Sequence, residues 1–153
     1  MYQRGQLYYL NNFQETPGSK PKPKYCIILD VVEGGVSIVF HKFTSQEYGF
    51  EKGSLKVGKN SIDETDDVYF IPKDKVIGVK GFMFPLDTYL YIGVWNVSNL
   101  SITDFEKYRP KYIDALQSDI YEDLLYFIYK SKHIKLKIKL ILEKTCEEVF
   151  SKK

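Results

Sequence analysis

The sequence predicts an α+β protein, mainly β, with its strands first and its helices at the C-terminal end. Up to about residue 96, short runs of β-branched and aromatic residues alternate with polar, Gly- and Pro-containing loops. The chain contains 13 Tyr and 10 Phe among 153 residues, and these types suit pleated, half-buried surfaces. From about residue 101, apolar residues recur at helical spacing. Because the strands are short and lack long crossovers, we expect a small antiparallel barrel with C-terminal helices.

Composition and length restrict the class of protein that this sequence can encode. We expect one domain over residues 4–153, with the barrel at roughly 4–96 and the helical part at roughly 101–150. A hydrophobic content of 44% excludes a largely disordered chain. The net charge of +2 is smaller than is usual for a domain that binds nucleic acid over its whole surface. Any anionic ligand must therefore be held by a local group of basic residues. The polar N-terminus and the lack of an apolar run of about 18 residues predict a cytoplasmic protein without a membrane partner.

Three strands are predicted between residues 6 and 44. Gln6–Leu10 forms a short strand, and residues 11–24 form a loop, because three prolines and a glycine interrupt them. Tyr25–Val32 is a nearly continuous apolar run, typical of a buried strand. Glu33-Gly34-Gly35 then makes a hairpin turn into the alternating strand Val36–Thr44.

The middle of the chain predicts weaker elements. Residues 45–67 are polar and irregular, with a short strand around Leu55. Val68–Ile71 and Asp87–Trp95 are the next clear strands, and Val76–Val79 is a weak one between them.

Three helices are predicted after residue 100, a short one followed by two longer ones. Ser101 and Asp104 have the spacing of a capping box, so a short helix begins there. Pro110 suits a first helical turn, and a longer amphipathic helix runs from Tyr112. Its apolar face consists of Ile113, Leu116, Ile120, Leu124, Phe127 and Ile128.

The last helix is predicted with an alternative. Ser131 can cap it, and apolar residues from Ile134 to Val149 share one face. Residues 134–140 also alternate Lys with Leu or Ile, which fits a strand of period two. Helix is preferred because the segment continues into Glu143-Lys144-Thr145-Cys146-Glu147-Glu148.

A basic loop and a hydroxyl-bearing strand end are the strongest functional signal. Residues 16–25 read Thr-Pro-Gly-Ser-Lys-Pro-Lys-Pro-Lys-Tyr, and Thr44-Ser45 ends a later strand. Lysine ammonium groups and hydroxyl donors together can cradle a phosphodiester. The structural alternative is a solvated, proline-stiffened loop and an ordinary strand-to-turn ending.

No metal or cofactor is predicted. Cys26 and Cys146 are far apart and lie in apolar patterns, typical of buried free thiols. With His41 and His133 there are too few ligands at suitable spacing for zinc.

The order of these motifs resembles the MazF/PemK family of bacterial toxin endoribonucleases. The resemblance spans most of residues 4 to about 128, and the segments that carry it include Arg4-Gly5-Gln6, Gly18-Ser19-Lys20, Thr44-Ser45-Gln46, Gly81-Phe82 and Leu100-Ser101. The resemblance implies an SH3-like barrel and metal-independent cleavage of single-stranded RNA. It also implies a homodimer and an antitoxin protein that binds across the same groove.

The resemblance also implies roles for individual residues. Thr44 donates to the phosphoryl oxygens and Lys24 supplies the cation. His41 is a candidate acid or base, although its odd separation from Thr44 puts the two on opposite faces of a strand. The expected RNA-binding residues are Lys20, Lys22, Tyr25, Ser45 and Gln46.

Two positions depart from the family pattern. The family has a catalytic Arg, followed by Pro, where this chain has Tyr25 and Cys26. The family's Gly-Asp pair is Gly5-Gln6 here, so that carboxylate is missing. These departures support an alternative, a catalytically inactive RNA- or peptide-binding module of the same fold.

Overall fold

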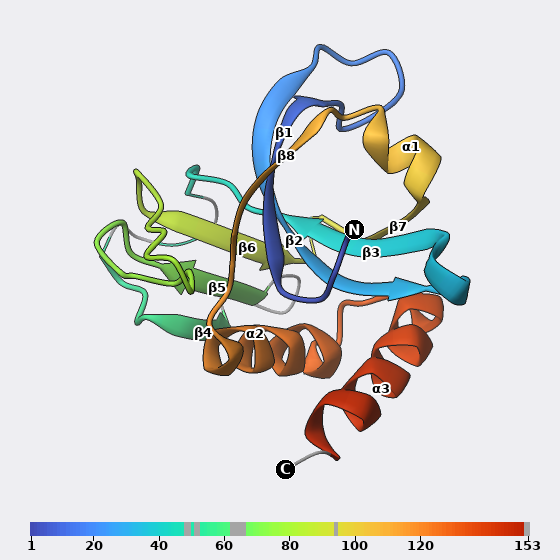
Figure 1. The fold of residues 1–153 in the computed structure, drawn as a ribbon. Helices are drawn as coiled ribbons and strands as arrows, with labels where there is room; N and C mark the ends of the chain where they lie inside the picture. The colour runs from blue at the N-terminus through green and yellow to red at the C-terminus, as the bar shows by residue number, and fades with distance from the viewer. Residues whose placement is uncertain (48–49, 51–52, 62–66, 94, 152–153) are drawn as a thin grey trace.

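Two antiparallel β-sheets, with α-helices at the C-terminal end, make up the computed structural model (Figure 1). It describes residues 1–47, 50, 53–61, 67–93 and 95–151. The predicted α+β, mainly β class with C-terminal helices is therefore confirmed. Among the described residues the strands do not close into a barrel, so the SH3-like barrel stays a prediction.

Each sheet combines strands that are distant in the sequence. The larger sheet, in the order β7-β3-β2-β1-β8, consists of β1 (Gln6–Phe13), β2 (Lys22–Val32), β3 (Ser37–Lys42), β7 (Ser98–Ser101) and β8 (Pro110–Ala115). The smaller sheet consists of β4 (Gly58–Ser61), β5 (Asp67–Ile71) and β6 (Thr88–Ile92). The helical elements are η1 (Glu33–Gly35), α1 (Ile102–Glu106), α2 (Ser118–Lys130) and α3 (Leu136–Phe150).

The two sheets are joined just after β3. Thr44 N donates to Tyr89 O over 2.9 Å, and Tyr89 N donates to Thr44 O over 2.8 Å. This bridge connects the chain leaving the larger sheet to β6 of the smaller one. Thr44 therefore lies at the junction of the two sheets, with 5% of its surface exposed.

The predicted loop over residues 11–24 is shorter than expected. β1 extends to Phe13 and β2 begins at Lys22, so Pro23 lies within a central strand. Pro23 is tolerated because β2 pairs with β3 only from Cys26 onward, and its register against β1 shifts between Leu10 and Phe13. No regular ladder bond is lost there.

The prediction of a helix from Tyr112 was wrong at its start. Pro110–Ala115 is the edge strand β8, which pairs with β1, and α2 begins only at Ser118. Proline suits the first residue of an edge strand as well as a first helical turn. The strand β8 therefore places part of the predicted helical region, 101–150, in the larger sheet.

The predicted helical signals after residue 100 are otherwise largely confirmed. Ser101 is the N-cap of α1, and its Oγ accepts from Asp104 N over 3.1 Å. Residues 136–140 are helical, which decides the alternative left open for 134–140. Ser131 does not cap α3, however, because it ends α2 and its hydroxyl donates to Asp67.

The middle of the chain differs from its prediction in two places. Leu55 lies in no strand, and β4 forms a few residues later, inside the stretch 45–67 that was predicted to be irregular. Residues 48–49, 51–52 and 62–66 of that stretch lie outside the described residues. Val76–Val79 is not a strand either, since only Gly78 makes an isolated bridge, to Leu116. The predicted strand Val68–Ile71 corresponds to β5, which begins at Asp67. The predicted strand Asp87–Trp95 corresponds to the shorter β6, and residue 94 lies outside the described residues.

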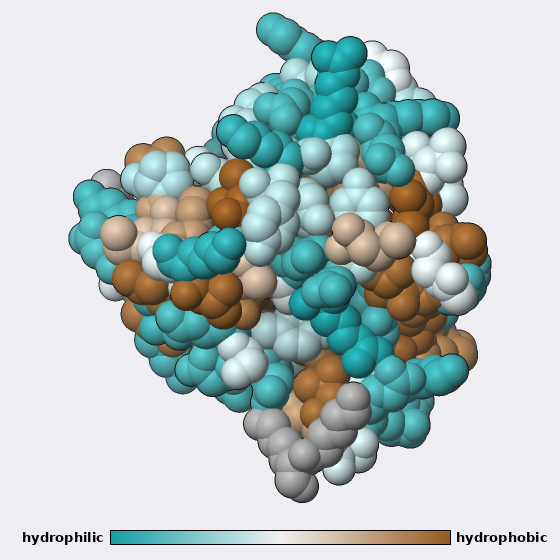
Figure 2. Space-filling model, viewed as in Figure 1, coloured by the Kyte–Doolittle hydropathy of each residue, from teal (hydrophilic) through white to brown (hydrophobic). Residues whose placement is uncertain are grey.

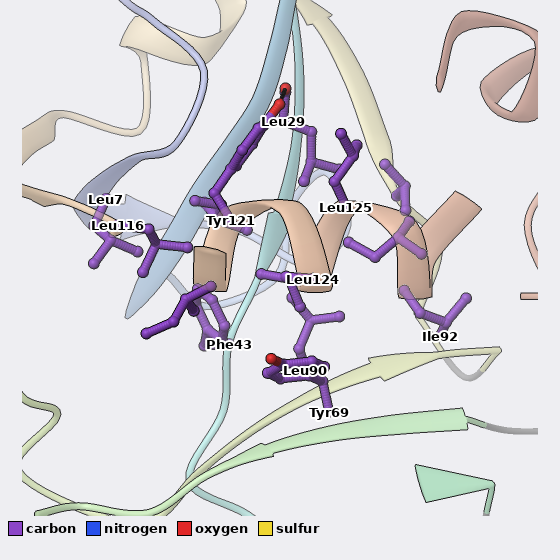
Figure 3. Close-up of a cluster of buried hydrophobic side chains, with 14 of the residues drawn as sticks. Leu7, Leu29, Phe43, Tyr69, Leu90, Ile92, Leu116, Tyr121, Leu124 and Leu125 are labelled. Carbon is purple, nitrogen blue, oxygen red and sulfur yellow. Dashed lines mark hydrogen bonds between the residues drawn. The ribbon is translucent and has the colours of Figure 1, made fainter. Parts of the chain in front are cut away.

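The main hydrophobic core lies between the two sheets and the C-terminal helices. In Figure 3, Leu124 and Leu125 of α2 lie among side chains from both sheets, including Leu29 and Leu90. The Tyr121 hydroxyl donates to Leu29 O over 2.6 Å, which ties α2 to β2. The opposite face of the larger sheet packs against α1 in a second cluster, so β2 is buried on both faces, as predicted.

Candidate nucleic-acid interface

The start of β2, the residues after β3 and the segment before β6 enclose a small cavity. Its volume is about 160 Å³. The residues that line it are Tyr9, Pro23, Lys24, Tyr25, Phe43, Thr44, Ser45, Pro85, Leu86 and Thr88. We call it the Lys24–Thr44 cavity, because these two side chains supply its principal polar contact.

Lys24 and Thr44 meet directly in this cavity. Lys24 Nζ donates to Thr44 Oγ1 over 3.3 Å, and Gln46 N donates to the same oxygen over 3.2 Å. Both of these bonds are accepted by the hydroxyl, so among the described residues its own proton is left for a ligand. Burial lowers the pKa of Lys24, as does the neighbouring charge of Lys22, while Glu15 opposes the shift.

Tyr25 contributes an aromatic wall to the cavity. Its ring centroid lies 4.8 Å from that of Tyr9 and 5.1 Å from that of Phe84, with edge-to-face geometry. These contacts position the ring through packing, and they leave it half-buried. The family that the sequence resembles has Arg at this position, whereas this chain has the packed side chain of Tyr25.

A second cavity of about 510 Å³ continues from the first, because Lys24 lines both. We call it the lysine cavity; the residues that line it are Phe13, Glu15, Ser19, Lys20, Lys22, Lys24, Gln46 and Trp95. The predicted RNA-binding residues therefore lie along one continuous surface. Figure 2 shows hydrophilic side chains over the β1–β2 loop, at the top of the view.

Local hydrogen bonds shape the loop that carries these lysines. Ser19 Oγ donates to Thr16 O over 2.7 Å, and Gln14 Nε2 donates to Ser19 O over 2.8 Å. Gly18 has a φ of 85°, in the left-handed region that glycine adopts without a steric cost. The Gly-Ser pair thus turns the chain so that the following lysines lie along the cavity.

His41 does not lie in either cavity. It is 1% exposed, and its Nε2 lies 2.6 Å from Tyr91 O, so this nitrogen must carry the proton and donate it. Burial lowers the pKa of His41 from 6.5 to about 4, with a smaller contribution from Lys42. The structure therefore places His41 as a buried, neutral residue and not as an acid or base that faces Thr44.

The buried imidazole predicts a pH-dependent stability. His41 takes up a proton more readily in the unfolded chain, so stability is fully present above about pH 6.5 and falls as the pH decreases towards about 4. The steepest contribution is about 1.4 kcal/mol per pH unit. Urea unfolding of wild type and His41→Gln between pH 4 and 7 measures it, since the glutamine amide can still donate to Tyr91 O. Equal pH dependence in the two proteins would contradict the prediction.

Several residues of this surface were missed by sequence reasoning. Lys42 is only 5% exposed, forms an ion pair with Glu15, and lies over the ring of Trp95. Lys42 precedes Thr44 by two residues, and side chains two residues apart in a strand point to the same face of the sheet. This spacing is the one signal in the sequence that could have identified Lys42. Its partners come from other segments and carry no local signal.

Among the residues that the structure describes, no group of three or more His, Cys, Asp or Glu side chains is placed to hold a metal ion. Within that same part of the chain, no helix is both long and apolar enough to cross a membrane. No protein-family model matches the sequence, and no curated protein matches it either.

Proposed function

We propose that this chain is a metal-independent endoribonuclease of the MazF/PemK type, which cleaves single-stranded RNA as the toxin of a toxin–antitoxin pair. The observation that carries the proposal is the Lys24–Thr44 contact in a cavity that continues into a lysine-lined surface. A cation and a hydroxyl donor, held together at one point, match the two non-bridging oxygens of a phosphodiester.

The proposed reaction is a transesterification within the RNA. The ribose 2′-oxygen attacks phosphorus and loses its proton to water, and the bond from phosphorus to the 5′-oxygen breaks. Negative charge grows on the non-bridging oxygens, where Lys24 and Thr44 stabilise it. Because the pKa of Lys24 is lowered, its ammonium group can also protonate the departing 5′-oxygen and regain a proton from water. The products are a 2′,3′-cyclic phosphate and a 5′-hydroxyl.

The lysine cavity supplies affinity in this proposal. Lys20 and Lys22 contact phosphates that flank the cleaved one, and Ser45 and Gln46 lie beside the reacting group. Tyr25, which lines the Lys24–Thr44 cavity, stacks on a neighbouring base in this proposal. Because lysine–phosphate contacts release counterions, RNA affinity should fall steeply as the salt concentration rises.

The remaining parts of the proposal come from the family resemblance. We infer an SH3-like arrangement, and the hydrogen-bonded junction at Thr44 and Tyr89, which links the two sheets, supports it. A homodimer, an antitoxin protein that covers the same cavities, and a cytoplasmic location complete the proposal.

An RNA cleavage assay tests the enzymatic proposal. Purified protein is incubated with end-labelled single-stranded RNA in EDTA, beside DNA of the same sequence. We expect the RNA to yield fragments with 2′,3′-cyclic phosphate ends and the DNA, which lacks the 2′-hydroxyl, to stay intact. Intact RNA, together with unimpaired growth when the protein is induced in bacteria, would refute the enzymatic proposal.

A binding module without catalysis is the second candidate. The packed ring of Tyr25 in place of the family's Arg and the burial of His41 favour it. It predicts salt-sensitive binding of the same RNA without any cleavage. Binding that does not change with salt would indicate a protein partner instead.

A further inference from the structure

An aromatic and charged slot lies beside the lysine cavity and is formed by Phe13, Glu15, Lys42 and Trp95. Phe13, Glu15 and Trp95 line that cavity and also an adjoining one of about 480 Å³, which Lys42 lines as well. Lys42 Nζ lies 4.0 Å from the centroid of the Trp95 ring and 5.5 Å from that of Phe13. The slot is therefore continuous with the surface that reaches Lys24 and Thr44.

The two charges of the slot differ in their access to solvent. The Lys42 side chain is 5% exposed and forms an ion pair with Glu15 Oε1, whereas the Glu15 side chain is 45% exposed. Lys42 thus serves as a buried anchor that holds the carboxylate at the cavity wall. A carboxylate has about four acceptor positions, so the bond from Lys42 leaves Glu15 able to accept further hydrogen bonds from a ligand.

We propose that this slot is a guanine-binding subsite of the RNA surface, an inference that rests on the proposed function. Guanine presents two adjacent donors, N1–H and the N2 amino group, which match the two oxygens of one carboxylate. Adenine, cytosine and uracil each place an acceptor beside the donor on that edge, so none of them can pair with Glu15 in this way. Single-stranded RNA is commonly read through such base edges while the base stacks on aromatic side chains. Phe13 and Trp95, which line both cavities, supply the aromatic surface beside Glu15 against which the base packs.

The cavity that the slot shares with Lys24 gives the subsite a defined relation to the reaction. Lys24 lines the lysine cavity together with Glu15 and Trp95, and the charge of Glu15 acts on the pKa of Lys24. A guanine in the slot would therefore hold the strand with its backbone along the lysines. The subsite would select where the strand is cut.

Binding of short oligonucleotides tests this inference. Fluorescence anisotropy is measured with 2′-O-methyl hexamers, which cannot be cleaved, of sequence UUUUUU, UUAUUU and UUGUUU. One carboxylate–guanine pair should favour the G hexamer about tenfold. Replacing the guanine by inosine, which lacks the N2 amino group, or by 1-methylguanosine, which lacks N1–H, should remove most of that preference.

The protein side of the test uses Glu15→Gln, with thermal unfolding to verify that the variant is folded. We expect it to bind the A and G hexamers within about threefold of each other. The base analogues need no variant, so the test holds even if the loss of the Glu15 charge destabilises the buried Lys42. Equal affinity of wild type for A and G hexamers would overturn the guanine subsite alone. Failure to bind any hexamer would overturn the RNA-binding proposal and the subsite with it.

Discussion

If the chain is the proposed ribonuclease, Lys24→Met should reduce the rate of RNA cleavage at least about a hundredfold. Methionine matches the length of the lysine stem but carries neither charge nor donor, so the phosphoryl oxygens lose their cation. Removing one donor from a site that stabilises transition-state charge typically costs about 10²–10³ in rate. The measurement is the single-turnover cleavage rate at saturating protein, which separates the chemical step from RNA affinity.

Thr44→Val and Lys137→Met make that experiment interpretable. Valine keeps the shape of Thr44 and its backbone bonds to Tyr89, so the loss of the hydroxyl alone is measured. Lys137 is an exposed lysine on α3, away from both cavities, and its replacement should leave the rate unchanged. Because Lys24 and Thr44 contact each other, the double variant should lose less than the product of the two single effects. A Lys24→Met protein that cuts RNA at the wild-type rate would exclude Lys24 from the reaction.

Gly78→Ala should destabilise the protein by about 4 kcal/mol. A Cβ at this position would lie 2.0 Å from Asp114 Oδ2 and 2.8 Å from Phe82 Cβ. Asp114 is 1% exposed, and its carboxylate accepts from the backbone N–H groups of Lys80 and Phe82. Overpacking typically costs about 1–3 kcal/mol, and a buried acceptor pushed from its donors adds about as much again. Urea unfolding measures the change.

A control substitution at Gly35 distinguishes the cost of a steric clash from the cost of backbone strain. Gly35, in the β2–β3 turn, has a φ of 95° but has no heavy atom within 4 Å of a built Cβ. Gly35→Ala should therefore cost only about 1 kcal/mol, the strain of a left-handed alanine. A Gly78→Ala protein no less stable than Gly35→Ala would show that Asp114 does not hold this segment. The segment matters to the site because it leads to Pro85 and Leu86, which line the Lys24–Thr44 cavity.

The confirmed sequence predictions share a local physical cause. Tyr25–Val32 was predicted to be a buried strand from its unbroken apolar run, and Ser101 was predicted as a cap from its spacing to Asp104. The last helix was predicted from apolar residues that recur on one face. Each signal lies within a few residues of the element it predicts, so the sequence alone contains it.

The wrong prediction at Pro110–Ala115 shows what a local signal cannot decide. A proline followed by apolar residues fits a helix start and an edge strand equally well. The segment is a strand because β1 has an open edge there, and that partner lies about a hundred residues away in the sequence. Pairing with a distant strand outweighed the local preference.

The sequence by itself determined the α+β class, the order of strands before helices, and the basic loop as the place to look for a site. Only the tertiary structure decided that Lys24 touches Thr44, that His41 is buried, and that Lys42 holds Glu15 beside the lysine cavity. The physical reason is that charge, burial and contact depend on what packs against a residue. Periodicity and capping depend only on a residue's neighbours in the chain. The candidate site brings together segments that are distant in the sequence, so no local pattern could predict its contacts.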